Sequence, residues 1–167
     1  MHDRVYLNRR VLALGDYDGA LRAAILALKR GERAPIEPFA ALLAERFAKP
    51  GAIVPVPTTR ARRAERGFDQ SRAVAQRYAE ITGVPLIDLL KKRAGPAQHG
   101  RTRERRLAAC GRFRLVSGPG NRSTLPSRIV LFDDVCTTGA TLRDAERALA
   151  EAGIAVSAWW ALAISQP

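Results

Sequence analysis

The sequence predicts an α/β fold, in which a single-domain, Rossmann-like parallel sheet is flanked by helices. The strongest indication is a strand–loop–helix–strand order in the last third of the chain, because parallel sheets are built from such crossover units. Its segments are an apolar strand at 128–132, a polar loop at 133–139, a helix at 140–152 and an apolar strand at 154–164. A shorter apolar run at 52–56, closed by Pro57, predicts a further strand that runs into a constrained loop.

Apolar residues at helical spacing predict three more helices. Their apolar faces consist of Ala20, Leu21, Ala24, Ile25 and Leu28, of Phe39, Leu42, Leu43 and Phe47, and of Val74, Tyr78 and Ile81. The first two lie in residues 1–50, which we expect to form a helical flank or hood, and residues 51–167 form the core of the same domain. The remaining segments are predicted to be short strands at 84–90 and 113–116 and basic loops at 58–66 and 91–112.

The positive charge of the chain is unevenly distributed. The net charge is +12, and the segment from Arg60 to Arg114 holds 15 basic and 5 acidic residues, a net of +10. A field concentrated in this way recruits anions such as polyphosphate or nucleic acid. The alternative is a solvated, arginine-rich face with no ligand.

Membrane and disulfide chemistry are not expected. No apolar stretch approaches the roughly 20 residues needed to span a bilayer, and the N-terminal apolar run meets Asp16 and Asp18, unlike a signal peptide. Cys110 and Cys136 form no CxxC pair and no metal framework. We therefore expect a cytoplasmic protein with reduced thiols.

The segment 130–142, VLFDDVCTTGATL, has the most chemical content. Asp133 and Asp134 directly follow an apolar strand, at the end of the strand where open α/β sheets bind ligands. The small, hydroxylated residues 137–141 lead into a helix N-terminus, which favours phosphate. Carboxylates suit sugar hydroxyls, or Mg²⁺ held through water. The predicted ligand is a phosphorylated sugar with magnesium; an isolated strand cap followed by an ordinary turn explains less of the pattern.

This segment resembles the phosphoribosyl pyrophosphate (PRPP) loop of the type I phosphoribosyltransferases. The resemblance implies the fold of that family and Mg²⁺-dependent transfer of phosphoribose with release of pyrophosphate. It also implies that the Thr-Thr-Gly turn holds the 5-phosphate and that the acidic pair holds the ribose hydroxyls. The implied PRPP contacts are Asp133, Asp134, Val135, Cys136, Thr137, Thr138, Gly139, Ala140 and Thr141.

Other segments resemble the ComF-type competence proteins, and the resemblance covers residues 12–164. These segments are Asp16 to Lys29, Pro55-Val56-Pro57, Arg66-Gly67-Phe68-Asp69-Gln70, Gln98-His99-Gly100, Arg105-Arg106 and Phe113. The family commonly opens with a four-cysteine zinc module, which this chain lacks, and it has Asn where Asp69 stands and after the arginine-rich stretch, where Ala108 stands. The resemblance implies a link to competence and DNA uptake.

Type I enzymes also have a loop for pyrophosphate and a basic loop that closes over the site. By position the first is Val56, Pro57, Thr58 and Thr59, with Arg60, Arg63 and Arg66 as further phosphate contacts. By composition the second is Gln98–Arg106, in which Arg103 and Arg105 are the predicted catalytic residues beside Asp133 and Asp134. The alternative is that these arginines are solvated or bind nucleic acid.

Several nearby residues have structural interpretations. Asp69 is expected to cap the helix that starts near Gln70, or to contact substrate, and Phe68 to staple that helix to the core. Trp159 and Trp160 are predicted to pack on the sheet. A helix N-terminus can lower the thiol pKa of Cys136. His99, in the closing loop, is expected to be a bystander rather than an acid or base.

Three functions are compatible with these features. The first is transfer of phosphoribose from PRPP, with Mg²⁺, to a nucleobase-like or amine acceptor. The second is a competence factor that binds single-stranded DNA or other competence proteins, although the basic segment holds only the aromatic residues Phe68, Tyr78 and Phe113 for base stacking. The third is a PRPP-sensing regulator. A homodimer is compatible with the sequence, and no residue pattern identifies the acceptor.

Overall fold

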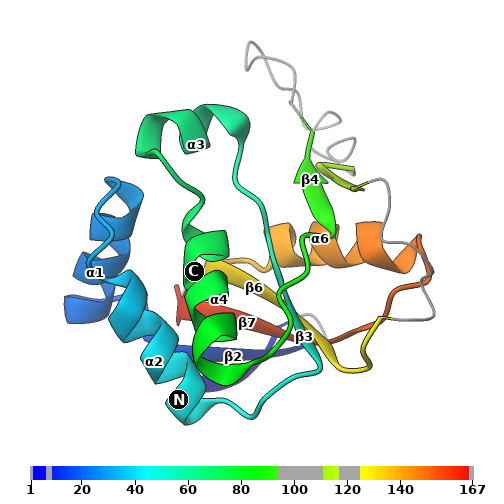
Figure 1. Ribbon diagram of the computed structural model, residues 1–167, viewed down its shortest axis with the longest axis horizontal. Coiled ribbons are helices and arrows are strands. Elements are labelled where there is room, and N and C mark those ends of the chain that lie inside the picture. The colour runs from blue at the N-terminus through cyan, green and yellow to red at the C-terminus, as the bar shows by residue number, and fades with distance from the viewer. Residues whose placement is uncertain (1, 7–8, 94–110, 117–124, 166–167) are drawn as a thin grey trace.

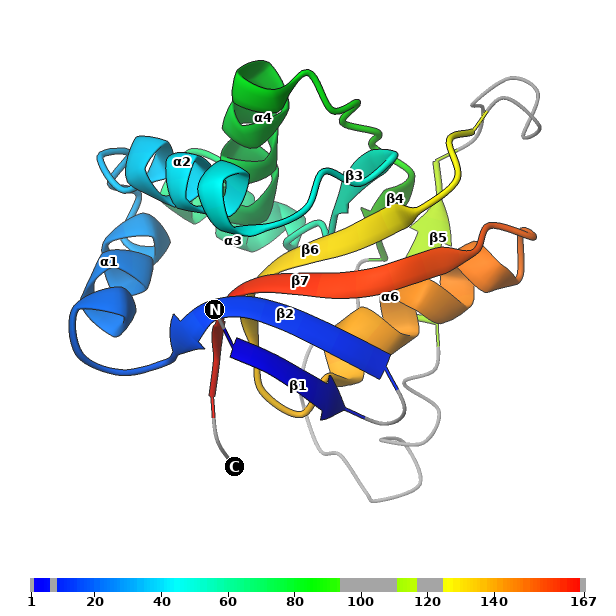
Figure 2. The same ribbon diagram turned by 90° about the horizontal axis from the view of Figure 1, so that it is seen from below.

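The computed structural model describes residues 2–6, 9–93, 111–116 and 125–165. Its main sheet has the strand order β1-β2-β7-β6-β3, and a separate two-stranded sheet pairs β4 with β5 (Figures 1 and 2). The strands are β1 (His2–Tyr6), β2 (Arg9–Asp16), β3 (Ala52–Pro55), β4 (Leu90–Lys92), β5 (Phe113–Leu115), β6 (Ile129–Cys136) and β7 (Val156–Ile164). Strands β2, β7, β6 and β3 are parallel, whereas β1 is antiparallel to β2. The predicted α/β fold with a parallel sheet is therefore confirmed.

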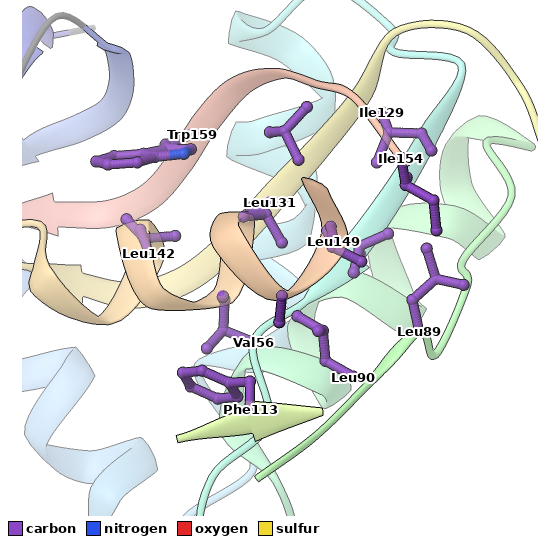
Figure 3. Packing of buried hydrophobic residues seen from close by; sticks show 14 of the residues in the cluster. Val56, Leu89, Leu90, Phe113, Ile129, Leu131, Leu142, Leu149, Ile154 and Trp159 are labelled. Atoms are coloured by element: carbon purple, nitrogen blue, oxygen red, sulfur yellow. The ribbon is translucent and has the colours of Figure 1, made fainter. Parts of the chain in front are cut away.

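Helices cover both faces of the main sheet (Figure 2). They are α1 (Gly19–Lys29), α2 (Ile36–Arg46), α3 (Arg60–Arg66), α4 (Gln70–Thr82) and α6 (Ala140–Ala150). Helices α1, α2 and α4 contribute buried residues to one apolar cluster, and α6 contributes to the other, together with β4 and β5. Figure 3 shows the second cluster, in which Leu142 and Leu149 of α6 lie near Leu131 of the sheet.

The central strands alternate between the two clusters, as the period of two in a strand requires. Ile129 and Leu131 belong to the cluster under α6, whereas Val130 and Phe132 belong to the opposite one. In the neighbouring strand the two tryptophans divide in the same way, with exposed fractions of 0% for Trp159 and 2% for Trp160. The prediction that they pack on the sheet is confirmed.

Four sequence predictions about local structure are corrected. Residues 1–50 are not only helical, because β2 pairs with β7 in the middle of the sheet; its apolar run is short and begins beside two arginines. The predicted basic loop 58–66 contains helix α3, and the predicted loop 133–139 begins with the last residues of β6. The predicted strand 84–90 is reduced to a bridge between Leu86 and Ile53, and β4 starts only at Leu90.

Helix α3 forms without burying a residue, so its ends must hold it. The hydroxyl of Thr59 accepts the N–H of Arg62 at 3.3 Å, and Gly67 ends the helix in the left-handed region at φ 78°. A hydroxyl at the N-cap and a left-handed glycine at the C-cap are common helix caps. The arginines of α3 thus project from a helix that is independent of the core.

At the amino ends of β3 and β6 two backbones approach closely. Gly51 N–H donates to the carbonyl of Arg128 at 3.1 Å, and a Cβ at position 51 would lie 1.8 Å from the carbonyl oxygen of Ser127. Only glycine fits this contact.

None of the helices in the described part of the chain has the length and apolar character that a membrane span requires.

Trp160 should be a main contributor to stability. Its ring makes edge-to-face contacts with Phe47, at 4.8 Å between centroids, and with Tyr78, at 5.7 Å. We expect Trp160→Ala to lower the free energy of unfolding by about 3–5 kcal/mol, measured by urea denaturation. Ile81→Ala, at a side chain that is 41% exposed, is the control and should change it by less than about 1 kcal/mol.

Candidate functional site

A cavity of about 360 Å³ lies at the carboxyl ends of β3 and β6. Its walls come from the β2–α1 turn, α1, the segment after β3, α3, α4, β4, β6, the start of α6 and the residue after β7. The lining residues are Tyr17, Lys29, Val56, Pro57, Thr58, Arg62, Arg66, Gln70, Ser71, Lys92, Asp133, Asp134, Val135, Thr137, Thr141 and Ser165.

Parallel pairing brings the two main motifs together. Pro55 of β3 is the register partner of Phe132 of β6, and Val56 N–H donates to the Phe132 carbonyl at 2.8 Å. The segment after Pro55 and the acidic pair after Phe132 therefore leave the same edge of the sheet side by side.

Each carboxylate of the acidic pair has its own partners. Asp133 Oδ1 accepts the Ser71 hydroxyl at 3.1 Å and the N–H of Asp134 at 2.9 Å. Asp134 Oδ1 accepts the N–H of Val135 at 2.8 Å, and its Oδ2 lies 3.3 Å from Lys29 Nζ. Helices α4 and α1, on one face of the sheet, therefore position both carboxylates.

Burial and the neighbouring charge of Asp134 raise the pKa of Asp133 to about 8, against the opposing effects of the Asp134 N–H, Ser71 and Lys92. Burial in turn lowers the pKa of Lys92, against the attraction of Asp133. The cavity thus contains a carboxyl group and an ammonium group that both disfavour their charged forms. Such an arrangement is typical of sites that bind ions or move protons.

Only some of the residues predicted to contact phosphate in the turn before α6 line the cavity. Thr137 and Thr141 line the cavity together with Asp133, Asp134 and Val135. The remaining predicted residues of this loop do not line it: Cys136, Thr138, Gly139 and Ala140. Gly139 precedes the first residue of α6 at φ 71°, which lets the chain turn sharply into the helix.

Cys136 corrects one prediction. Its side chain is 1% exposed, and burial, with the charge of Asp133, raises the thiol pKa to about 11 instead of lowering it. A thiol with such a pKa stays protonated at neutral pH, so its chemistry is that of a core residue.

Part of the predicted pyrophosphate segment lines the cavity. Val56, Pro57, Thr58 and Arg66 line the cavity, whereas Thr59 caps α3 and Arg60 does not line it. Because residues four apart share a helix face, Arg62 lies on the cavity side with Arg66, and Arg63 does not line the cavity. Because the sequence predicted a loop at 58–66, it did not predict that Arg62 and Arg66 share a helix face.

Asp69 joins the Val56–Thr59 segment, the predicted pyrophosphate loop, to α4. Its Oδ1 accepts the N–H of Arg72 at 3.2 Å, and its Oδ2 accepts the N–H of Thr58 at 2.8 Å. The predicted helix cap is confirmed, and Phe68, 8% exposed, packs in the core beside it. The second carboxylate oxygen has a role of its own, because it orients the backbone of Thr58 at the cavity wall.

Several predicted residues lie outside the described residues. They are the closing segment Gln98–Arg106, with His99, Arg103 and Arg105, and also Cys110 and Ala108. Arg93 and Gly111 are the nearest described residues on either side of this segment. They adjoin the β4–β5 hairpin, whose Lys92 lines the cavity.

Seven lining residues were not predicted as site residues. They are Tyr17, Lys29, Arg62, Gln70, Ser71, Lys92 and Ser165. The i, i+4 spacing to Arg66 could have identified Arg62, and a lysine two residues after the buried Leu90 could have indicated an inward position for Lys92. Tyr17, Lys29 and Ser165 reach the cavity only through the fold.

The acidic pair is compatible with magnesium. Within the described ranges no group of three or more His, Cys, Asp or Glu side chains could hold a metal ion. Two hard carboxylates beside a polar cavity suit Mg²⁺ that takes most of its ligands from phosphate oxygens and water.

A parallel sheet with an acidic pair at the end of a central strand, followed by a Thr-Thr-Gly turn into a helix, is the arrangement that the resemblance to the type I phosphoribosyltransferases implies. No family model matches the chain. The chain is 31% identical to competence protein ComFC of Bacillus subtilis over 157 residues, which are 90% of this chain and 62% of that protein. It is 36% identical to ComFC of Streptococcus pneumoniae over 117 residues, 69% of this chain and 50% of that protein.

Two further similarities concern phosphoribosyl chemistry and fold. An orotate phosphoribosyltransferase of Nocardioides sp. is 36% identical over 78 residues, 46% of this chain and 40% of that enzyme. A solved structure of the allosteric regulatory enzyme of purine biosynthesis has a TM-score of 0.48 and 20% identity over 83% of this chain and 26% of its own. Over the matched residues the chain is a homologue of the ComF-type competence proteins, and it spans 50–62% of the ComFC lengths.

The raised pKa of Asp133 predicts an effect of pH on stability. Asn at this position keeps an oxygen for the Asp134 N–H and the Ser71 hydroxyl but does not ionise. Because the pKa is 3.8 for an ordinary Asp and about 8 in the fold, the folded state binds the extra proton and loses stability as pH rises through this window. We expect Asp133→Asn to melt a few degrees above the wild type at about pH 8, with a smaller difference at about pH 5.

Thermal unfolding across this pH range measures the effect, with Asp88→Asn, at an exposed surface carboxylate, as control. A variant that is less stable at the upper pH, or a difference independent of pH, contradicts the assignment.

Asp69→Asn should weaken the pyrophosphate segment specifically. Asn can still cap α4 through its oxygen, but its amide group then faces the N–H of Thr58, and two donors cannot bond. We expect a loss of about 1–2 kcal/mol in the free energy of unfolding and faster hydrogen exchange at the Thr58 amide. Asp88→Asn, which changes only an exposed pairing with Arg72, should leave the Thr58 amide unchanged. Equal exchange in both variants contradicts the role of Asp69.

Proposed function

We propose that this competence-protein homologue binds PRPP with Mg²⁺ and transfers its phosphoribosyl group to a nitrogenous acceptor, with release of pyrophosphate. The observation that supports the proposal is one cavity that joins an acidic pair, two threonines at a helix N-terminus and basic side chains from three other elements. A ligand with a sugar, a monophosphate and a diphosphate matches these three kinds of group.

Each part of PRPP has a complementary wall. Thr137 and Thr141, at the start of α6, suit the 5-phosphate, since hydroxyls and the helix dipole favour an anion there. Asp133 and Asp134 accept hydrogen bonds from the ribose hydroxyls. The pyrophosphate lies toward Thr58 and the arginines of α3 that line the cavity.

In the proposed reaction the bond from C1 to the pyrophosphate oxygen breaks, and a bond from C1 to the acceptor nitrogen forms. Magnesium, when bound with PRPP, neutralises charge on the leaving group. Arg62 and Arg66 meet the remaining negative charge as it develops. Asp133, whose pKa is raised, is suited to take the proton that the acceptor nitrogen loses. Tyr17 and Ser165 also line the cavity, and we assign the acceptor to their side of it.

The two faces of α3 allow a matched test of PRPP binding. Arg62 and Arg66 line the cavity, whereas Arg60 and Arg63, on the same helix, do not. We expect an Arg62→Ala, Arg66→Ala variant to lose more than about tenfold in affinity for PRPP with Mg²⁺, because two charge-assisted hydrogen bonds are removed. An Arg60→Ala, Arg63→Ala variant loses the same charge and should change affinity by less than about threefold. Isothermal titration calorimetry measures both.

The proposal fails if the wild type binds no PRPP, or if both arginine pairs matter equally. Undiminished binding by an Asp133→Asn, Asp134→Asn variant also contradicts it.

A second candidate is single-stranded DNA binding by a competence factor. It is favoured by the arginines of α3, of which Arg60, Arg62 and Arg63 make no ion pair within the described ranges. An exposed helix with unpaired arginines suits a phosphate backbone.

DNA binding predicts a different response from the same variants. Both arginine pairs should contribute about equally to the affinity for a single-stranded oligonucleotide. The slope of log affinity against log salt should fall by about 0.7 for each phosphate contact that is lost. Gel shifts over a salt series measure this, and unchanged affinity in the variant lacking all four arginines removes this candidate.

A further inference from the structure

We propose that Asp144 is a positioning residue of the cavity: it fixes the β4–β5 hairpin to α6 and so holds Lys92 opposite Asp133. This inference rests on the proposed function, because Lys92 then faces the bound pyrophosphate. Asp144 itself does not line the cavity.

Asp144 is a buried carboxylate surrounded by donors. Its side chain is 9% exposed, and it accepts the backbone N–H groups of Gly111 at 3.2 Å and Arg112 at 3.1 Å. It also accepts Arg112 Nε at 3.3 Å and an Arg147 guanidinium nitrogen at 2.8 Å. Two of these donors belong to the backbone that leads into β5, so the carboxylate fixes the main chain of the hairpin and not only a side chain.

Through the pairing of β4 with β5, the contacts of Asp144 also fix the position of Lys92. Arg93 N–H donates to the Arg112 carbonyl at 2.7 Å, and Lys92 is the register partner of Phe113. In β4 the side chain of Leu90 is buried, that of Lys91 is exposed, and that of Lys92 is half-buried on the inward face. Lys92 Nζ lies 5.4 Å from the centroid of the Phe113 ring. Figure 3 shows Leu90 and Phe113 of this face turned toward the core beside Val56.

A pairing of three residues per strand is too short to hold its own position. The hairpin therefore depends on its contacts with α6, and among the described residues Asp144 accepts three hydrogen bonds from Gly111 and Arg112. Helix α6 begins at the turn that contributes Thr141 to the cavity, one helical turn before Asp144. A single carboxylate thus connects the phosphate turn on one side of the cavity with the ammonium group on the other.

Glu146 provides a matched control on the same helix. It is 8% exposed and pairs with Arg9 at the start of β2, far from the hairpin in sequence and in a different sheet. Glu146→Gln and Asp144→Asn therefore each neutralise one buried carboxylate of α6, but only Asp144→Asn alters the anchor of the hairpin. Asp144→Glu, which keeps the charge, tests for partial rescue.

The first measurement needs no ligand. The chain has four lysines, so ¹³C-methylation of their amines gives a simple NMR spectrum that can be titrated with pH. In the wild type the Lys92 signal should titrate below the ordinary lysine pKa of 10.5, since burial lowers the pKa of Lys92. We expect Asp144→Asn to raise the pKa of Lys92 toward the ordinary lysine value of 10.5, and Glu146→Gln to leave it unchanged.

The second measurement is a double-mutant cycle on affinity for PRPP with Mg²⁺. Asp144→Asn and Lys92→Met should each weaken binding by about fivefold or more, and Asp144→Asn should have little further effect once Lys92 is Met. Glu146→Gln should leave affinity within about twofold of the wild type. If Asp144 stabilised the fold without positioning Lys92, the losses of affinity caused by Asp144→Asn and Lys92→Met would be additive.

The outcomes separate the two proposals. If Lys92 keeps its titration in Asp144→Asn, or if the losses are additive, the positioning role is overturned. If the titration shifts as expected but the wild type binds no PRPP, Asp144 positions Lys92 and the proposed function is wrong.

Discussion

The parallel pairing of β3 with β6 is the interaction on which the site depends. It is a short ladder, from Ala52 opposite Ile129 to Pro55 opposite Phe132. At its carboxyl end it places the Val56–Thr58 segment beside the acidic pair, although the two motifs are far apart in the chain. The helices on both faces then add side chains to this edge: Ser71 and Lys29 from one side, and Thr141 from the other.

The ionisable groups of the cavity lower the stability of the fold. The sheet buries a carboxyl group at Asp133 where an apolar residue would continue the strand pattern of β6 without cost. The hydroxyl of Ser71 and the half-buried Lys92 offset part of the burial, but the pKa of Asp133 remains raised. Under the proposed function, the sugar hydroxyls and the metal ion of the ligand would supply what the protein alone does not, and binding would relieve this unfavourable burial.

Local patterns in the sequence predicted the parts of the molecule that local forces determine. The helices over 20–28, 39–47 and 70–81, the crossover at 128–164 and the cap at Asp69 follow from periodicity and from residue chemistry within a few positions. Strand β2 was missed because its place in the sheet is set by pairing with β7, at the other end of the chain. Lys29 and Ser71 were missed for the same reason, since each meets the acidic pair only through tertiary packing.

The close backbone contact at Gly51 has a consequence for the opposite end of β3. Because the carbonyl of Ser127 occupies the space of a side chain at position 51, any other residue there must push the two strands apart or slide one along the other. A ladder this short offers few other contacts that resist such a shift. The alignment of the Val56–Thr58 segment with the acidic pair is therefore set in part by a residue that does not line the cavity. Substitution at Gly51 would change the shape of the cavity while leaving every lining side chain in the sequence intact.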